Sequence, residues 1–157
     1  MKVLLPGSYD PITLGHLDII RRAAREHEVY VVIFVNPEKT YTFSVEERLE
    51  MLSLAVSDIE GATVDFYGGY VVDYMRKKGI DKIIKGYRTE KDLAYERLQA
   101  EYNFANGGFE TELYESATEY RSISSTLARE RILSGESLDG ILPEAVIKYI
   151  KDKKRSI

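Results

Sequence analysis

The sequence contains no cysteine and no tryptophan, and only four of its 157 residues are proline. The absence of cysteine excludes disulfide bonds and thiolate metal sites, and it fits a reducing compartment. No apolar run approaches the roughly 20 residues that a membrane-spanning helix needs. The first ten residues, MKVLLPGSYD, hold too short an apolar stretch for the core of a signal peptide. The composition therefore predicts a cytoplasmic protein that does not engage a membrane.

An excess of basic residues is also missing. Twenty-two Lys and Arg residues against 26 Asp and Glu residues give a formal net charge of −4. Proteins that bind duplex nucleic acid usually carry a net basic field, so this charge disfavours a nucleic-acid partner. What is present is an ordinary globular composition, with 44% hydrophobic and 31% charged residues. Without repeats, low-complexity stretches or linkers, residues 1–157 are expected to form one domain.

Strands and helices are expected to alternate along the chain. The apolar, β-branched run Val29–Val35 is typical of a strand covered on both faces, and Ser44 with Glu47 forms a capping-box pattern that opens a helix. We expect strands at Lys2–Leu5, Val29–Val35, Thr63–Tyr67, Lys82–Lys85 and Glu110–Glu115. Helices are expected at Gly15–His27, from Ser44 to about Val56, Val71–Lys78, about Lys91–Ala105, from Ser124 to near Gly135, and from Pro143 onward. This alternation predicts an α/β fold with a doubly wound, parallel, five-stranded sheet, in which ligands bind beyond the carboxyl ends of the strands.

The segment PGSYDPITLGH joins the first expected strand to the first expected helix. Gly7 allows backbone N–H groups to approach a ligand, Ser8 adds a hydroxyl, and His16 falls in the first turn of a helix whose N-terminus favours phosphate. A lone Gly-x-x-x-His pattern is more often a turn with a capping histidine. The full stretch Gly7–His16, however, resembles the G-[ST]-[FY]-D-P-x-T-x-G-H signature of phosphopantetheine adenylyltransferases. Its last four residues match the shorter T/H-x-G-H motif of the wider nucleotidyltransferase superfamily, which implies a Rossmann-like nucleotidyltransferase fold.

Lys39 lies in the loop after the second expected strand, at the same edge of the sheet. A loop lysine is by default simply exposed to solvent. The stretch NPEKTYTFSVEERLEML is nevertheless similar to the family's N/S-P-x-K-x-x-x-F-[ST]-x-E-E-R segment, whose lysine contacts phosphopantetheine. We expect Glu46 or Glu47 to pair with Arg48 and so to hold the start of the helix.

A third segment, IIKGYR, leaves the fourth expected strand. Gly86 permits backbone contact with a ligand, and Arg88 offers a planar fork suited to phosphate oxygens, although an isolated K-G-x-R is more often a charged turn. The family carries R-G-[LI]-R here, which implies that the first of these residues meets the acceptor and that Gly86, Tyr87 and Arg88 meet ATP. Lys85 replaces the usual arginine, so the charge is retained and the bidentate geometry is lost.

Two further residues follow from the same resemblance. Glu96, eight residues after Arg88, matches the family's D-[FL]-x-Y-E and by resemblance touches the nucleotide. The alternatives are a solvated helix carboxylate or a partner that orients a nearby arginine. Val71 aligns with an apolar position of the acceptor pocket, although core packing is the stronger expectation there.

The fourth segment opens the helix expected from Ser124. Helix capping explains at least one of its hydroxyls, but three consecutive ones exceed what capping needs, and with free N–H groups they suit the β- and γ-phosphates of ATP. The family shows x-[FY]-[IL]-S-S-[ST] here, and Arg121-Ser122 is the larger departure from it. The resemblance implies ATP contacts from Tyr120, Arg121, Ser122, Ile123, Ser124, Ser125 and Thr126.

Together the four segments imply a transferase that joins the adenylyl group of ATP to 4′-phosphopantetheine. Because the acceptor phosphate is already an anion, we expect neither a general base nor a covalent intermediate, only positioning and charge neutralisation. Mg²⁺ is expected to travel with the triphosphate rather than in a protein metal site. The family typically forms hexamers, so a homohexamer is expected. The residues assigned to catalysis are His16, Lys39 and Arg88; further ATP contacts are Ser8 and Tyr9; acceptor contacts are Ser8, Lys39, Val71 and Lys85.

Two other functions are compatible with parts of these motifs. A cytidylyltransferase or a nicotinamide-mononucleotide adenylyltransferase shares the Gly-His turn and a hydroxyl-rich helix start, but lacks the joint pattern of all four segments. A nucleotide-binding regulatory module without turnover would have no need of His16, Lys39 and Arg88 together.

Overall fold

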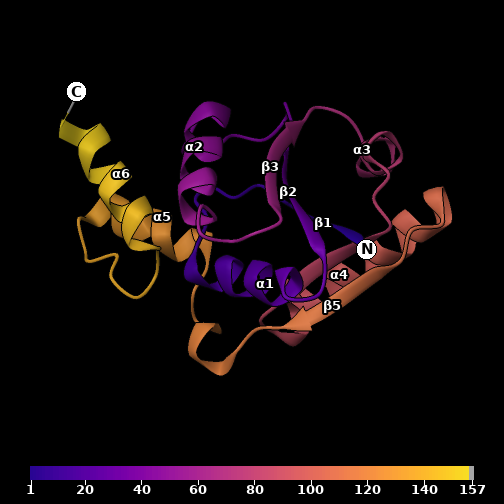
Figure 1. Cartoon of the computed structure of the whole chain (residues 1–157). Helices are drawn as coiled ribbons and strands as arrows, with labels where there is room; N and C mark the ends of the chain where they lie inside the picture. The colour runs from indigo at the N-terminus through magenta and orange to yellow at the C-terminus, as the bar shows by residue number, and fades with distance from the viewer. Residues whose placement is uncertain (156–157) are drawn as a thin grey trace.

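A five-stranded sheet forms the centre of the computed structural model (Figure 1). The structure describes the backbone of residues 1–155 and the side chains of residues 1–154. The strands are β1 (Lys2–Gly7), β2 (Glu28–Phe34), β3 (Ala62–Tyr67), β4 (Lys82–Tyr87) and β5 (Thr111–Glu115). Every neighbouring pair is parallel, in the order β3-β2-β1-β4-β5. The predicted parallel, five-stranded α/β fold is therefore confirmed.

Helices cover the sheet on both faces (Figure 1). They are α1 (Leu14–Ala24), α2 (Val45–Ala55), α3 (Val71–Lys78), α4 (Glu90–Gly107), α5 (Ser125–Ser134) and α6 (Glu144–Arg155), with a short 3₁₀ turn, η1 (Thr118–Tyr120). None of the helices in the described part of the chain combines the length and the apolar character that crossing a bilayer requires.

Alternating side chains of the central strands build two separate apolar clusters. Leu5 and Val31 pack into the larger cluster, which contains buried residues of α1, α2, α5 and α6. Leu4 and Val32, one residue away in each strand, belong instead to the smaller cluster, which contains Tyr74 of α3. Burial on both faces explains why β2 reads as a continuous apolar run rather than an alternating one.

Element boundaries differ from the sequence prediction by a few residues. β1 continues through Pro6 and Gly7, which pair with Val32 and Ile33 of β2, although the missing N–H of proline favoured an earlier end. α1 ends at Ala24, before the expected end at His27. The turn η1 was not predicted from the sequence.

The strand order creates a switch point beside β1. β1 pairs with β2, its successor in the chain, on one side and with β4 on the other. The connections that leave β1 and β4 therefore depart toward opposite faces, which opens a crevice beyond their carboxyl ends. The segments Gly7–His16 and Lys85–Arg88 begin within the last residues of β1 and β4, and Lys39 follows β2, so all three lie at this edge.

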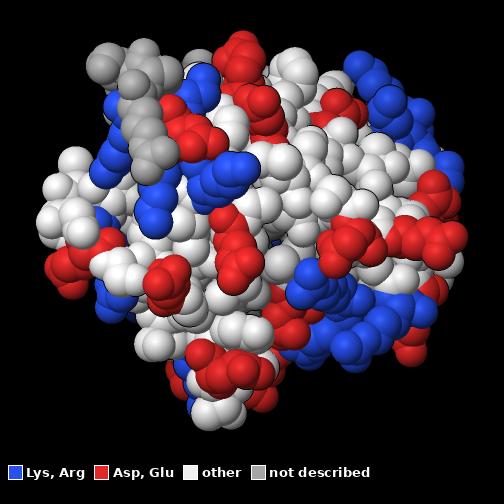
Figure 2. All heavy atoms as spheres, turned by 60° about the vertical axis from the view of Figure 1, so that its left-hand side comes forward, with Lys and Arg blue, Asp and Glu red and all other residues white. Residues whose placement is uncertain are grey.

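Charged residues of both signs lie on one face of the molecule, interrupted by uncharged surface (Figure 2). On the face drawn in Figure 2, Lys and Arg side chains lie beside Asp and Glu side chains, and neither sign covers the face. This distribution agrees with the small net charge of −4.

Candidate active site

A cleft of about 780 Å³ opens at the switch point of the sheet. Its walls come from the turn after β1, the loop after β2, the end of β4 with the start of α4, and the start of α5. All four sequence segments therefore contribute to one cleft. The predicted site residues that line it are Ser8, Tyr9, His16, Lys39, Lys85, Gly86, Tyr87, Arg88, Glu96, Ile123, Ser124, Ser125 and Thr126.

The turn after β1 is shaped by the packing of Tyr9. A Cβ atom at Gly7 would lie 3.0 Å from the Tyr9 ring, so a larger residue at position 7 would displace that ring. Tyr9 has a positive φ of 47°, is 7% exposed, and donates its hydroxyl to the carbonyl of Leu5 at 3.0 Å. Its ring meets the His16 ring edge-on, with the centroids 5.1 Å apart. The Tyr9 ring thus packs against the His16 imidazole within the wall of the cleft.

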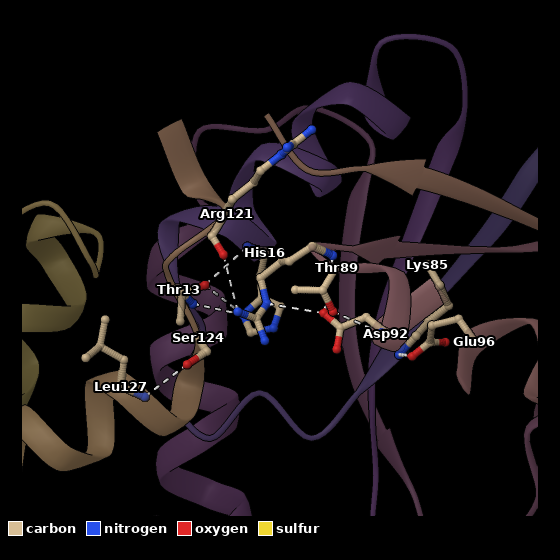
Figure 3. Close-up of polar contacts among 10 residues, drawn as sticks. Thr13, His16, Lys85, Thr89, Asp92, Glu96, Arg121, Ser124 and Leu127 are labelled. Atoms are coloured by element: carbon tan, nitrogen blue, oxygen red, sulfur yellow. Dashed lines mark hydrogen bonds and ion pairs between the residues drawn. The ribbon is translucent and has the colours of Figure 1, made fainter. Parts of the chain in front are cut away.

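His16 is held in one orientation and one tautomer. Thr13 is the N-cap of α1, and its backbone N–H donates to Nδ1 of His16 at 3.0 Å, while the His16 N–H donates to the Thr13 hydroxyl at 3.3 Å (Figure 3). Because Nδ1 accepts a hydrogen bond, the ring proton lies on Nε2. His16 therefore caps its helix, as the simpler interpretation expected, and still has a free N–H donor.

The charge state of His16 follows from its surroundings. Burial of the ring and then the positive charges of Lys85 and Arg88 lower the pKa of His16 from 6.5 to about 4. The imidazole is therefore neutral at neutral pH and serves as a hydrogen-bond donor. Because the folded pKa lies below the unfolded value of 6.5, this group stabilises the fold above pH 6.5, and that stabilisation is lost as the pH falls toward 4.

We expect the His16 imidazole of the ligand-free protein to stay neutral from about pH 8 down to about pH 5. Long-range ¹H–¹⁵N correlation spectra should show Nε2 protonated and Nδ1 bare throughout this range, with titration beginning only as the pH approaches 4. His16→Ala identifies the resonance by its disappearance. A midpoint near 6.5 would contradict the arrangement described above.

The loop after β2 carries Lys39 to the rim of the cleft. The Lys39 ammonium lies 5.6 Å from the centre of the Tyr41 ring, and its backbone N–H donates to the Asn36 carbonyl at 3.1 Å. The side chain is exposed, as expected for a loop lysine, and it also lines the cleft.

The expected pairing of Arg48 with Glu46 or Glu47 is wrong. Arg48 is 1% exposed, and its guanidinium donates to the carbonyls of Phe43 at 3.1 Å and Ser8 at 2.9 Å. Glu47 instead completes the capping box of α2 by accepting the Ser44 N–H. The two carbonyls supply hydrogen bonds that replace water around the buried Arg48 cation.

β4 delivers Lys85 and Gly86 to the floor of the cleft. The Lys85 ammonium donates to the Pro6 carbonyl at 3.2 Å and lies 3.8 Å from Glu96, toward which it points in Figure 3. Burial raises the pKa of Glu96, and the nearby Lys85 charge opposes this effect. At Gly86 a Cβ atom would lie 2.9 Å from the Ile19 side chain, so close packing of β4 on α1 requires glycine there.

Arg88 is oriented from two sides. Its Nε lies 3.6 Å from the Asp92 carboxylate, in the first turn of α4, and its Nη1 donates to the Arg121 carbonyl at 3.4 Å. The Asp92 carboxylate also accepts the backbone N–H of Arg88 at 3.3 Å. The guanidinium keeps further N–H groups for a ligand.

The start of α5 presents hydroxyls and backbone N–H groups to the opposite wall. Ser124 is the N-cap and accepts the Leu127 N–H at 3.0 Å. Ser125 donates to the Pro11 carbonyl at 2.8 Å, and Arg129 donates to the Asp10 carbonyl at 2.9 Å. These bonds tie α5 to the turn after β1, and the unpaired N–H groups of the first helical turn add partial positive charge.

Comparison with known proteins agrees with this geometry. Residues 4–131 match the family model described as cytidylyltransferase-like. A phosphopantetheine adenylyltransferase of Symbiobacterium thermophilum is 41% identical over 155 residues, which cover 98% of this chain and 96% of that protein. Proteins of the same name from Corynebacterium efficiens (39% identical, 98% of both chains) and Corynebacterium diphtheriae (40%, 99% of both chains) are similar over the same extent. The chain belongs to the phosphopantetheine adenylyltransferase family.

Four residues that family resemblance assigns to substrates lie outside the cleft lining. Val71 begins α3 and packs against the smaller apolar cluster. Tyr120 ends η1 and packs against the larger cluster, while Arg121 and Ser122 are exposed. The Arg121 guanidinium points away from His16 in Figure 3 and donates to Glu115. Arg121 contributes its carbonyl, which orients Arg88.

Several cleft residues were not identified from the sequence. Lys91 and Arg129 add two cations, so that five cations and three carboxylates line the cleft of a chain whose net charge is −4. Helical spacing could have identified Arg129 from the sequence. It lies three residues after Thr126 and four after Ser125, and it therefore shares their face of α5. Lys91 likewise lies in the first turn of α4, close to Arg88. The cleft is therefore suited to polyanions despite the acidic chain.

Proposed function

We propose that this chain transfers the adenylyl group of ATP to 4′-phosphopantetheine, giving dephospho-coenzyme A and pyrophosphate. One observation carries the proposal most strongly: segments separated by more than a hundred residues meet in a single, locally positive cleft, in a chain related over its whole length to proteins named phosphopantetheine adenylyltransferase. The reaction needs two phosphate groups held beside each other, and this cleft offers cations on both sides of His16.

The reaction is an in-line displacement at phosphorus. An oxygen of the acceptor phosphate bonds to the α-phosphorus of ATP, the bond from that phosphorus to the bridging oxygen of the β-phosphate breaks, and pyrophosphate leaves. No proton has to be removed from the nucleophile. His16, neutral and protonated on Nε2, donates to an α-phosphate oxygen and binds it more strongly as negative charge gathers there in the transition state.

The triphosphate lies on the α5 side of the cleft in this proposal. Arg88 and Arg129, together with the N–H groups and hydroxyls from Ser124 to Thr126, hold the β- and γ-phosphates and then the departing pyrophosphate. Gly86 and Tyr87 border the nucleotide along the end of β4, and Glu96 lies beyond them on α4.

The acceptor phosphate lies on the β1–β2 side. Ser8 and Lys39 bind it from the two loops that flank the cleft, and Lys85 reaches it from the floor. Because Lys85 already contacts Pro6 and Glu96, it offers one point charge where the family's arginine offers a fork. Val71 is retained as an acceptor contact only by resemblance, since it lies outside the cleft lining.

Mg²⁺ would be held chiefly by oxygens of the triphosphate. Among the described residues no three His, Cys, Asp or Glu side chains gather into a metal-binding group. The carboxylates that line the cleft already have partners: Asp10 accepts two backbone N–H groups, Asp92 orients Arg88, and Glu96 pairs with Lys85. Magnesium usually keeps several waters and binds through substrate phosphates, so this lining suits it, and the metal would supply neutralisation of phosphate charge.

Pyrophosphate release with defined substrate pairs tests the proposal. The chain should release pyrophosphate with ATP plus 4′-phosphopantetheine and not with CTP plus glycerol 3-phosphate or ATP plus nicotinamide mononucleotide. Turnover with either of the other pairs would favour the corresponding relative. Binding of ATP without release from any pair would favour a nucleotide-binding regulatory module, and the proposed function would be wrong.

We further propose that the protein is cytoplasmic and that it forms a homohexamer. Helix α4 contains no buried residue and exposes large apolar side chains along much of its length, a surface that a second copy of the chain would cover. These side chains are Tyr95 (60% exposed), Leu98 (65%), Tyr102 (56%) and Phe104 (58%).

Light scattering should give about 108 kDa, six times the chain mass of 18.0 kDa. Leu98→Glu should lower this mass because it places a charge in the proposed interface. Leu133→Glu is the matched control, since Leu133 is 90% exposed on α5, away from α4. A wild-type mass of 18.0 kDa at micromolar concentration would contradict the assembly.

A further inference from the structure

Two charged residues are buried at the acceptor side of the cleft. Asp10 is 4% exposed and Arg48 is 1% exposed. Neither forms an ion pair with another side chain in the part of the chain that the structure describes. Burying a charge is costly unless hydrogen bonds replace its water, so the partners of these two groups indicate what they do.

The Asp10 carboxylate binds the backbone of the Lys39 loop. Its two oxygens accept the N–H groups of Thr42 and Phe43, each at 2.9 Å. Asp10 itself belongs to the turn after β1, two residues from Ser8. The carboxylate therefore joins the turn that carries Ser8 to the loop that carries Lys39.

The Arg48 guanidinium makes the same connection from α2. It donates to the Phe43 carbonyl at 3.1 Å and to the Ser8 carbonyl at 2.9 Å. Its central carbon lies 4.0 Å from the centre of the Tyr41 ring, and the Lys39 ammonium lies 5.6 Å from the same ring. Contacts thus run from Ser8 through Arg48 and Tyr41 to Lys39.

Phe43 is bound on both sides by these two groups. Its N–H donates to Asp10 and its carbonyl accepts from Arg48. Among the described residues, the hydrogen bonds that join residues 36–44 to the turn at residues 7–13 are made by Asp10, and Arg48 bridges the two segments. Lys39 itself is exposed, so its placement depends on how the loop is held.

We infer that Asp10 and Arg48 are positioning residues for the acceptor: they fix the distance between Ser8 and Lys39, so that a hydroxyl and an ammonium from separate loops meet one phosphate. The inference rests on the proposed function. It predicts a specific kinetic signature, because among the described residues no hydrogen bond joins residues 36–44 to β4 or to the start of α5, which form the ATP side of the cleft; α5 is bonded instead to backbone carbonyls of the turn after β1.

Arg48→Lys keeps the buried charge and loses the fork and the ring stacking. We expect it to raise KM for 4′-phosphopantetheine about tenfold or more, with KM for ATP changed less than about twofold. Asp10→Asn should act in the same direction, because an amide accepts one of the two N–H groups and turns a donor toward the other. It serves as the second variant if Arg48→Lys does not fold.

Glu47→Gln is the matched control. Glu47 accepts the Ser44 N–H at 2.9 Å at the start of the same helix, and it has no hydrogen bond to residues 7–13. Glu47→Gln should weaken the start of α2 while the hydrogen bonds that hold the Lys39 loop stay intact. Thermal unfolding should compare the variants, and an equal rise of acceptor KM in Glu47→Gln at equal stability would reduce Asp10 and Arg48 to a structural role and overturn the inference.

A double-mutant cycle with Lys39→Ala separates positioning from stability. In the wild-type background Lys39→Ala removes a phosphate contact and raises acceptor KM; in the Arg48→Lys background it should add little, because Lys39 is already displaced. Full additivity would overturn the inference while leaving the proposed function intact. A wild-type protein that neither binds nor turns over 4′-phosphopantetheine would overturn both.

Discussion

His16→Ala should lower kcat about 10²-fold or more, with a smaller change in KM for ATP. His16 supplies one N–H donor, and removing a single donor aimed at developing charge costs this much when the donor acts mainly in the transition state. The donor is ready before substrate binds, because Thr13 fixes the tautomer and the low pKa, about 4, keeps the ring neutral. Steady-state pyrophosphate release, with both substrates varied, measures the effect.

His27→Ala is the control for removal of a histidine. His27 lines a separate hollow at the amino-terminal edge of the sheet, beside Met1 and Lys2. Its variant should keep kcat near the wild-type value. Near-normal kcat in His16→Ala would remove His16 from the mechanism.

The pH profile separates donation by His16 from acid–base catalysis. A phosphate ester loses its second proton at about pH 6, so titration of the acceptor itself gives the pH–rate profile a limb near that pH. If His16 is only a donor, that limb should persist in His16→Ala at lower overall rate. Its disappearance in the variant would assign the limb to His16 and contradict a folded pKa of about 4.

Sequence patterns predicted the sheet because the main signals are local. The β2 run and the capping box at Ser44 and Glu47 reflect burial and hydrogen bonding within a few residues of the chain. The strand order is a property of non-local pairing, and no local pattern specifies that β4 rather than β3 lies beside β1. The alternation of strands and helices predicted ligand binding beyond the carboxyl ends of the strands, and the cleft at that edge does bring the four segments together.

Side-chain partners were harder to predict than elements. Arg48 follows two glutamates, so sequence proximity suggested an ion pair; the structure instead gives it carbonyls of Phe43 and Ser8, the latter 40 residues away. Arg129 was missed because its partner, the Asp10 carbonyl, lies 119 residues earlier. Both arginines donate to backbone carbonyls of the turn after β1. Every residue type has a backbone carbonyl, so the sequence does not indicate which residues accept these hydrogen bonds.

Arg88→Ala should lower kcat/KM for ATP by about 10³-fold, the lower range for an arginine that stabilises phosphoryl transfer. Arg88 is held by Asp92 and by the Arg121 carbonyl, so its remaining N–H groups are aimed before ATP binds. Arg88→Lys should recover part of the loss, since charge returns without the fork. Arg21→Ala is the control, because Arg21 pairs with Asp58 on the surface with 49% of its side chain exposed.

The reverse reaction tests whether Arg88 acts on the pyrophosphate. With dephospho-coenzyme A and pyrophosphate as substrates, Arg88→Ala should raise KM for pyrophosphate more than KM for dephospho-coenzyme A, because the guanidinium lies beside the start of α5. Lys39→Ala should show the opposite preference in the forward direction, with acceptor KM raised more than ATP KM. Equal effects of both variants on both substrates would mean that the two cations act through the general field of the cleft, and the division into an acceptor side and a pyrophosphate side would be wrong.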